Sequence, residues 1–414
     1  MSTGVRLGLR ANAGQFALLV ALNALVGAMV GLERSVLPLV GKHDFGLRST
    51  SAVLAFVVAF GAAKALTNLA AGAVAERLSR KRVLVAGWLA ALPVPVLIAL
   101  APSWWWIVGA NVLLGVNQGL AWSMTVVMKI DLAGPSRRGL ALGLNEAAGY
   151  LGVAIAAFAT GALAASYGPR TVVWGGAAAL AATGLVASIV FVRDTGEHVR
   201  FEEGESGRTA PSFGAAFTSV SFREPILRAC SQAGLVNNLN DALAWGLGPL
   251  YLAAHGVSVR QIAIVAAAYP LVWGAGQLVT GWLSDHTGRK PLISSGMLLQ
   301  AGALGLLVGG DGSFAPSLTA AVLLGAGTAM VYPTLLAAVS DSVRPRERAQ
   351  AVGIYRFWRD FGFVAGALIA GLGADTTSLS TAIVIVAALT GASGLAVIAT
   401  PWNHPVRVQP QPAD

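Results

Sequence analysis

The sequence contains few charged residues and a single cysteine. Charged residues make up 11% of the 414-residue chain, against about 25% in a soluble globular protein. Hydrophobic residues make up 55%, and the mean hydropathy is +0.68. The lone Cys230 excludes an intramolecular disulfide and any metal or iron–sulfur site built on several cysteines of one chain. This scarcity of charge is typical of an integral membrane protein.

Several classes of function lack the residues that they would need. None of the five histidines lies within a long apolar run, so we expect no histidine metal site or proton relay. The chain has no phosphate-binding loop, metal-ligand spacing or nucleophile motif, so we predict no enzyme, no cofactor and no ATPase. The net charge of +9 would suggest nucleic acid in a soluble protein. Here the basic residues gather between apolar runs, and we predict no nucleic-acid partner.

Apolar runs long enough to cross a bilayer recur throughout the chain. A spanning helix needs about 20 apolar residues, and in lipid its backbone must satisfy its own hydrogen bonds. We therefore predict an all-α integral membrane protein with twelve transmembrane helices. The predicted spans are 15–40, 49–75, 83–101, 105–129, 139–166, 171–192, 226–253, 260–284, 292–310, 315–338, 349–372 and 378–400.

Lysine and arginine are unequally distributed between the alternating loops. If both termini are cytoplasmic, 20 of these residues lie on the cytoplasmic side and 4 lie outside. This asymmetry follows the positive-inside rule, so we predict cytoplasmic termini and a location in the plasma (inner) membrane. The first apolar run is too long for a signal-peptide core, and we predict an uncleaved first helix.

Two short basic turns lie about half the chain apart, each between two apolar runs. Residues 72–82 read GAVAERLSRKR, and residues 281–290 read GWLSDHTGRK. The second turn follows the pattern Gly-x-x-x-Asp-x-x-Gly-Arg-Lys, whereas the first has Glu76 for the aspartate and Ser79 for the turn glycine. The pattern resembles the cytoplasmic signature loop of the major facilitator superfamily, which joins helices 2 and 3 and recurs between helices 8 and 9.

The resemblance implies that the two turns close the cytoplasmic side. In the family the loop forms latches between helices 2 and 11 and between helices 8 and 5, which break when the protein opens inward. The first glycine lets a neighbouring helix approach closely, and the acid pairs with an arginine or with the positive N-terminus of a facing helix. The corresponding gating residues are Gly72, Glu76, Arg77 and Arg80 in the first turn, and Gly281, Asp285, Gly288 and Arg289 in the second.

A second motif repeats with almost the same offset. Asp131 and Arg138 frame one turn, and 210 residues later Asp341 and Arg348 frame another with the same spacing. Both repeats together predict a duplicated six-helix unit, and transporters built from such repeats place their site between the halves. The predicted segments are a cytoplasmic N-terminal segment (1–14), a first bundle (15–192), a cytoplasmic linker (193–225), a second bundle (226–400) and a disordered tail (401–414).

Eight ionisable residues fall within the predicted spans and away from the span ends. A charge in the middle of a membrane costs about 2.5–3.5 kcal/mol even on the lower scales. Eight unpaired charges would thus cost more than about 20 kcal/mol, which exceeds ordinary protein stability. We therefore expect them to face protein or water and largely to pair with one another. They are Glu33, Arg34, Lys64, Glu146, Asp241, Arg356, Arg359 and Asp360.

Their spacing predicts the walls of a polar cavity. The third, sixth, ninth and twelfth spans carry none of them, and the resemblance implies that these four helices face lipid. Asn237 and Asp241 are four residues apart and share a helix face, which adds Asn237 to the predicted substrate and proton-coupling residues. Arg356 and Asp360 also share a face and can pair within their helix. Glu146 and Arg356 occupy equivalent positions of the repeat, at an offset of 210.

The acids are the candidates for coupling protons to a conformational switch. A buried carboxylate that is paired in one state and hydrated in the other changes its proton affinity. We rank Asp241 and Glu33 first and Glu146 next. A competing hypothesis is an ion-pair network that links Asp241 or Glu146 to Arg356 or Arg359 and only stabilises closed states. Lys64 could neutralise Glu33 or attract an anion.

The resemblance and the buried charges together predict a secondary transporter that works by alternating access. We favour proton-coupled export of a small organic compound, with protons, a small-molecule substrate and the lipid bilayer as partners, and we expect a monomer. A competing hypothesis is uptake or exchange of a small organic anion, because four of the eight buried charges are basic. An uncoupled facilitator and a non-transporting sensor or scaffold are the remaining hypotheses.

Overall fold

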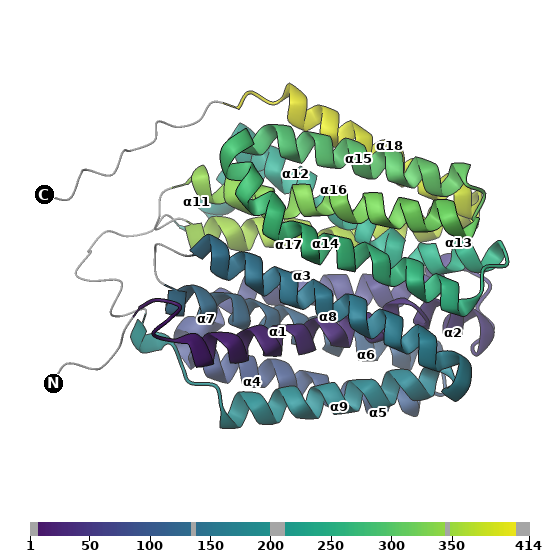
Figure 1. The fold of residues 1–414 in the computed structure, drawn as a ribbon, viewed down its shortest axis with the longest axis horizontal. Coiled ribbons are helices and arrows are strands. Elements are labelled where there is room, and N and C mark those ends of the chain that lie inside the picture. The colour runs from purple at the N-terminus through teal and green to yellow at the C-terminus, as the bar shows by residue number, and fades with distance from the viewer. Residues whose placement is uncertain (1–6, 134–137, 199–211, 344–347, 403–414) are drawn as a thin grey trace, which may run out of the picture.

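The computed structural model describes residues 7–133, 138–198, 212–343 and 348–402, with side chains except those of residues 72–77, 138–142, 282, 285, 340 and 348–350. Nearly all of the described residues are helical, and none of them forms a strand. The helices form two bundles that lie side by side (Figure 1). The predicted all-α fold, with twelve membrane helices as two six-helix bundles, is therefore confirmed.

The first bundle consists of six helical units, three of which are interrupted. Pro38 and Pro93 each follow an interruption, as expected for a residue that cannot donate a helical hydrogen bond. In the fourth unit the interruption is a single π-helical turn, η1. The units are α1–α2 (Ala13–Arg34, Leu37–His43), α3 (Thr50–Leu78), α4–α5 (Arg80–Ala91, Pro93–Ala99), α6–η1–α7 (Trp104–Asn117, Gln118–Trp122, Ser123–Ala133), α8 (Arg138–Tyr167) and α9 (Pro169–Val190).

The second bundle follows the short elements α11 (Phe213–Thr218) and η3 (Ser219–Arg223), which lie against α17. The indole Nε1 of Trp358 donates to Ser221 Oγ at 2.8 Å, and the Phe217 ring packs against Trp358. The six units of this bundle are α12–η4–α13 (Pro225–Ala242, Leu243–Leu247, Gly248–Ala254), α14 (Val259–Thr287), α15 (Arg289–Gly309), α16 (Phe314–Asp341), α17 (Arg348–Thr376) and α18 (Leu379–Ala399).

Nine of the described helical segments are long and apolar enough to cross a membrane. The three units that fall outside this set are α6–η1–α7, α12–η4–α13 and α17. They carry Lys129 and Asp131, the stretch 237–241, and the stretch 356–360. A buried polar stripe lowers the average hydropathy of a helix without preventing it from spanning, because neighbouring helices cover the stripe. The polar content of these units therefore marks the interior of the protein.

The two bundles meet along two helix pairs, α3 with α17 and α8 with α14. Glycine permits the close contact in the second pair, because a Cβ on Gly161 would overlap the Cβ of Ala263. The start of α1 and the end of α18 lie at the same end of the molecule, on the left of Figure 1. We call this the terminal end, and the opposite end the far end.

The far end is closed by a contact between the bundles. Asp375, in the last turn of α17 and beyond the predicted span, accepts hydrogen bonds from the first residues of α3. Ser49 Oγ donates at 2.7 Å and the Ser51 backbone N–H at 3.0 Å, and the Thr50 N–H and Ser51 Oγ also donate. Partial burial acts to raise the pKa of Asp375, but the hydrogen bonds from Ser51, Ser49 and Thr50 outweigh it and lower this pKa to about 2.

Candidate functional site

A polar pocket lies between the two bundles, near the middle of the helices. Its empty volume is about 220 Å³. Helix α3, η1 and α7 of the first bundle supply one part of the wall, and α16 and α17 of the second supply the rest. The lining residues are Lys64, Asn68, Trp122, Ser123, Tyr332, Arg356, Arg359 and Asp360.

The carboxylate of Asp360 is the acceptor at the centre of this pocket. Arg359 Nη1 donates to Asp360 Oδ1 at 2.8 Å, and Lys64 Nζ lies 3.7 Å from the same oxygen. The side-chain amide of Asn68 donates to Oδ2, and that of Asn238 donates to Oδ1 at 3.5 Å. Because Lys64 and Asn68 belong to α3, these contacts join the two bundles.

A second carboxylate, Glu146 of α8, binds a different arginine. Arg356 Nη2 lies 3.4 Å from Glu146 Oε1, which also accepts from Trp122 Nε1 and Asn145 Nδ2, both at 3.1 Å. The predicted pair of Arg356 with Asp360 is therefore replaced by pairs with other partners. Arg356 reaches across to the first bundle, and the neighbouring Arg359 neutralises Asp360. Lys64 likewise pairs with Asp360 and not with Glu33.

Aromatic rings surround the guanidinium of Arg359. Its Nη2 donates to the Tyr150 hydroxyl oxygen at 2.8 Å, and its Cζ lies 4.1 Å from the centroid of the Tyr332 ring. The Tyr150 ring stacks on Trp273 of α14, with centroids 3.5 Å apart and an interplanar angle of 28°. Tyr150 therefore joins α8 to both α14 and α17 at the boundary between the bundles.

Asp241 and Glu33 lie outside this pocket and are fully buried. The hydroxyl of Tyr269 donates to Asp241 Oδ1 and lies 3.2 Å from Thr328 Oγ1. Within the described part of the chain, no side chain or backbone group hydrogen-bonds to Asp241 Oδ2 or to Glu33 Oε2. Each of these acids thus keeps an oxygen without a described partner. Arg34, beside Glu33, is enclosed by aromatic rings from both bundles.

The structure places Asn237 away from the other candidates. Its Oδ1 accepts from Gln300 Nε2 of α15 at 3.0 Å, and Gln300 Oε1 accepts from Asn240. This buried amide cluster lies within the second bundle and joins α12 to α15. Although Asn237 and Asp241 are four residues apart, one side chain meets α15 and the other meets α14. The two residues therefore contact different helices, although their spacing places them on one side of α12.

Sequence reasoning missed several polar residues of the site. Lys129, the last residue of a predicted span, is fully buried, and its Nζ donates to the Leu19 carbonyl at 3.0 Å. Asn68 and Ser123 bind each other at 2.7 Å and line the pocket. Asn68 lies four residues after Lys64, so the helical spacing could have identified it.

The two basic turns contact the repeated aspartates. Arg80 Nε lies 3.0 Å from Asp131 Oδ2, and Arg289 Nε lies 3.1 Å from Asp341 Oδ2. The two sequence repeats thus interlock in each bundle in the same way. Ser79 and Gly288 precede these arginines with closely similar backbone angles, φ 79° and 87°, ψ 151° and 161°.

The structure describes only some of the residues that the predicted latches of these two turns would need. The side chains of Glu76, Arg77 and Asp285, together with Gly72, lie outside the residues whose side chains are described, so the latches remain predictions. A Cβ on Gly281 would have none of the described atoms within 4 Å, and the close helix approach predicted there stays a prediction, because side chains at the facing start of α8 lie outside the described ones.

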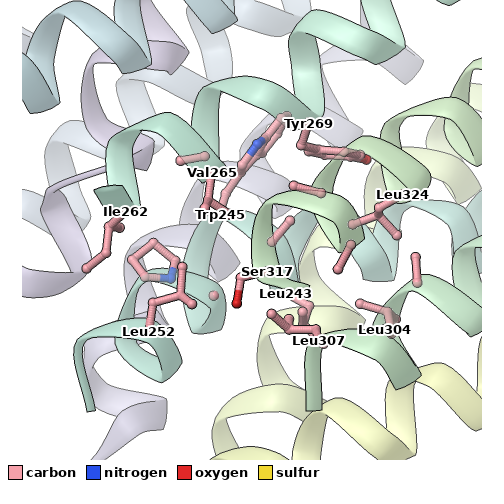
Figure 2. Close-up of a pocket in the computed structure, with 17 residues that line it drawn as sticks. Leu243, Trp245, Leu252, Ile262, Val265, Tyr269, Leu304, Leu307, Ser317 and Leu324 are labelled. Carbon is pink, nitrogen blue, oxygen red and sulfur yellow. The ribbon is translucent and has the colours of Figure 1, made fainter. Parts of the chain in front are cut away.

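A larger cavity lies within the second bundle, with an empty volume of about 530 Å³ (Figure 2). Its walls come from η4, α13, α14, α15 and α16 and are almost entirely apolar. Ser317 is a polar group in the wall, and Tyr269 and Trp245 separate the cavity from Asp241 and Arg34. No described charged residue lines this cavity, so the polar pocket between the bundles is the stronger candidate for a site that binds a polar substrate.

Comparison with known proteins gives a family for the whole chain. The sequence model described as Major Facilitator Superfamily matches residues 16–239 and 230–413. The 3-(3-hydroxy-phenyl)propionate transporter of Escherichia coli K12 is 27% identical over 325 residues, which cover 76% of each chain. The MFS-type transporter phiD of a fungal species is 27% identical over 155 residues, 37% of this chain. The present chain spans 23% of the length of that fungal relative.

A solved structure has the same fold. The crystal structure of the human organic anion transporter MFSD10 (TETRAN) superposes with a TM-score of 0.71, and the match covers 93% of this chain and 99% of that one. The sequence identity is 17%, so this likeness concerns the fold alone.

Proposed function

Because the chain belongs to the major facilitator superfamily, we propose that it is a proton-coupled secondary transporter of a small organic anion. Membership makes it an integral membrane transporter and not an enzyme. The proposal for the substrate rests on one observation. Lys64, Arg356 and Arg359 line the polar pocket, whereas Asp360 is the acid among its lining residues.

The pocket chemistry suits an anion with a flat apolar part. Arg356 and Arg359 present planar guanidinium forks that match a carboxylate. Trp122 and Tyr332 line the same pocket and offer ring faces to the remainder of the molecule. The transporter from Escherichia coli, which is similar over 76% of this chain, is named for an aryl carboxylate. This supports an organic anion over the leading expectation of an unspecified organic compound, and the predicted export direction stays a prediction.

Alternating access would use the contacts that cross between the bundles. Lys64 with Asp360, Arg356 with Glu146 and Arg359 with Tyr150 each join one bundle to the other. A substrate carboxylate that enters the pocket competes with Asp360 and Glu146 for these cations. Binding would therefore weaken the cross-bundle contacts, and the bundles could then rock about the occupied site. In this structure Asp375 joins the two bundles at the far end.

Proton coupling is assigned to Asp241, with Glu33 and Glu146 as further candidates. Asp241 is fully buried and, within the described part of the chain, binds Tyr269 through one oxygen only. Separation of the bundles would change its hydration and its distance from the basic side chains, and both factors alter the proton affinity of a carboxylate. We place the terminal end in the cytoplasm, because the alternating loops are basic at that end.

Transport by purified protein in liposomes tests the proposal. The liposomes contain a pH-sensitive dye, and 3-phenylpropionate, 3-phenylpropylamine and 3-phenylpropanol are offered in turn. We expect uptake and proton flux with the carboxylate, and at least a tenfold loss of uptake in Arg359→Gln. The matched control is Arg170→Gln, since Arg170 donates to backbone carbonyls at the end of α5. Selective uptake of the amine would contradict the proposal, and carboxylate uptake without proton flux would favour an uncoupled facilitator.

A further inference from the structure

Arg34 is a fully buried cation without a hydrogen-bonding partner among the described residues. Its exposed fraction is 0%, and none of its three guanidinium nitrogens bonds to any group in the described part of the chain. Among the described acids, Glu33 and Asp241 interact electrostatically with the Arg34 guanidinium. Neither of these two described acids forms an ion pair with it. A buried charge that lacks hydrogen bonds is costly, so this arrangement calls for a functional explanation.

Aromatic rings take the place of the missing acceptors. The Cζ of Arg34 lies 4.6 Å from the centroid of Phe60, 5.5 Å from that of Phe56 and 5.5 Å from that of Trp245. Cation–π contacts of this kind compensate part of the lost hydration. They leave all five N–H groups of the guanidinium available to an acceptor that enters from outside.

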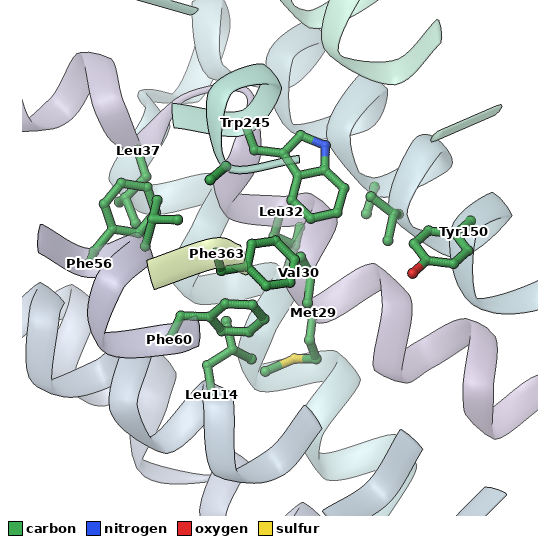
Figure 3. Packing of buried hydrophobic residues seen from close by; sticks show 14 of the residues in the cluster. Met29, Val30, Leu32, Leu37, Phe56, Phe60, Leu114, Tyr150, Trp245 and Phe363 are labelled. Carbon is green, nitrogen blue, oxygen red and sulfur yellow. The ribbon is translucent and has the colours of Figure 1, made fainter. Parts of the chain in front are cut away.

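The rings around Arg34 belong to different bundles. Phe56 and Phe60 lie on α3, in the same bundle as Arg34, whereas Trp245 lies on η4 of the other bundle. Trp245 stacks on Phe363 of α17, with centroids 5.8 Å apart and an interplanar angle of 19°. Figure 3 shows Phe60, Phe363 and Trp245 gathered together. If the bundles separate at the far end, Trp245 moves away from Arg34, while Phe56 and Phe60 stay beside it.

The ring of Phe60 lies beside Arg34 and also beside Lys64 of the polar pocket. Phe60 packs edge-on against Phe363, with centroids 5.5 Å apart. Lys64, which lines the pocket, approaches the same two rings at 5.7 Å and 5.3 Å. Since α3 starts at the far end, Phe60 is one turn nearer that end than Lys64. Arg34, the last residue of α1, likewise lies toward the far end, whereas the pocket lies toward the terminal end.

We propose that Arg34 is a second anion subsite, which binds the carboxylate of an aromatic substrate when the far end is open. The retreat of Trp245 and Asp241 with the second bundle exposes one face of the guanidinium to the cleft. A carboxylate can then bind through two parallel hydrogen bonds, and Phe56 and Phe60 offer ring faces to the aromatic part. The anion passes between Phe60 and Phe363 to reach Lys64, Arg356 and Arg359. This inference rests on the proposed transport of an organic anion.

The experiment measures substrate affinity separately from the two sides of the membrane. Vesicles of opposite orientation are prepared with the wild type, Arg34→Gln and Arg34→Lys, and the probe is radiolabelled 3-phenylpropionate. For Arg34→Gln we expect the KM for entry from the far side to rise at least tenfold. The KM for entry from the terminal side should change less than twofold. Arg34→Lys, which keeps the charge but loses the planar fork, should give an intermediate far-side KM.

The controls separate this inference from the proposed function. Arg170→Gln removes a far-end arginine that binds backbone carbonyls and should leave both KM values unchanged. An equal far-side KM in the wild type and Arg34→Gln would overturn the subsite while leaving anion transport intact. Absence of carboxylate transport in the wild type would overturn the proposed function itself. If Arg34→Gln does not fold, Arg34→Lys decides, because a purely structural cation would leave its far-side KM unchanged.

Discussion

Glu146 and Arg356 occupy equivalent positions in the two halves of the chain, 210 residues apart, and they contact each other directly at 3.4 Å. Equivalent residues of a repeat meet in this way only close to the axis that relates the two halves. The contact therefore marks the centre of the molecule, where α8 and α17 supply side chains of opposite charge. It also joins the two bundles at the level of the polar pocket.

The first prediction concerns the coupling between these two residues. The side chains are 4% and 12% exposed, and removal of one partner from a buried pair costs about 3–5 kcal/mol. We expect Glu146→Gln and Arg356→Gln each to destabilise the protein. The free energy of unfolding that the double variant loses should be smaller than the sum of the two single losses, by at least about 1 kcal/mol. Thermal unfolding in detergent measures the cycle, and strictly additive losses would refute the coupling.

The second prediction concerns Asp241 as the proton-linked acid. Asparagine keeps an oxygen that can accept from Tyr269 but cannot be ionised. We expect Asp241→Asn to fold and to exchange substrate across the membrane, while proton flux falls below detection. The measurement combines counterflow of 3-phenylpropionate with an internal pH dye. Tyr269→Phe is the control, because it removes the hydrogen bond and keeps the carboxylate.

The outcome of this test separates two roles for Asp241. Retained proton flux in Asp241→Asn would exclude it as the coupling group and leave Glu33 and Glu146. Loss of the folded protein, seen by size-exclusion chromatography, would instead support a structural role within the second bundle.

The third prediction concerns backbone strain at Ser79. With φ 79° and ψ 151°, this residue adopts a conformation that belongs almost entirely to glycine and costs another residue about 1–3 kcal/mol. Glycine also gains more conformational entropy on unfolding, so we expect Ser79→Gly to stabilise the protein by about 1 kcal/mol. The equivalent change in the other half, Gly288→Ser, should destabilise it by a similar amount. A change in the melting temperature of the same sign in both variants would argue against strain.

The fourth prediction concerns the far-end contact of Asp375. Because its folded-state pKa of about 2 lies below the ordinary value of about 3.9, its contribution to closure is fully present above about pH 4. That contribution is lost only as the pH falls through 2. Between pH 5 and 8 we therefore expect no titration of this contact, whereas Asp375→Asn should open the far end at every pH in this range.

Cysteine labelling measures this opening. Leu54 is fully buried near the far end and packs against Gly246 of the other bundle. In a Cys230→Ser background, Leu54→Cys should react severalfold faster with a membrane-impermeant maleimide when Asp375→Asn is also present. Asp311→Asn is the matched control, since Asp311 pairs with His255 within the second bundle. Equal labelling rates in all three proteins would show that Asp375 does not hold the far end.

The number of helices and the repeat could be predicted from the sequence because both leave a periodic signal. Length and hydropathy define a membrane span, and the offset of about 210 residues appears in two independent motifs. The gathering of buried charge was also predictable, since unpaired charges are too costly in lipid. Lys64, Glu146, Arg356, Arg359 and Asp360 do contact one another or the same pocket.

The pairing of these charges could not be predicted from spacing. Arg356 and Asp360 lie one helical turn apart, yet Arg356 pairs across the bundle boundary and Asp360 pairs with its immediate neighbour. Which partner is nearer depends on how α17 is rotated relative to α3 and α8, and one sequence does not encode that rotation in any local pattern. The rotation of α12 likewise decides that Asn237 contacts Gln300 of α15, whereas Asp241 contacts Tyr269 of α14. Lys129 is the last residue of a predicted span, and its burial could not be predicted because its helix continues beyond the apolar run to Ala133.

The π-helical turn η1 ends on Trp122, which lines the polar pocket, and η4 is centred on Trp245, which lies beside Arg34. A π-helical turn holds one residue more than an α-helical turn, so it absorbs a single insertion that would otherwise rotate the rest of the helix by about 100°. These are the places where the chain can gain or lose one residue without disturbing α7 or α13. A one-codon deletion in either turn would thus redirect the indole of Trp122 or Trp245 with no amino-acid replacement elsewhere.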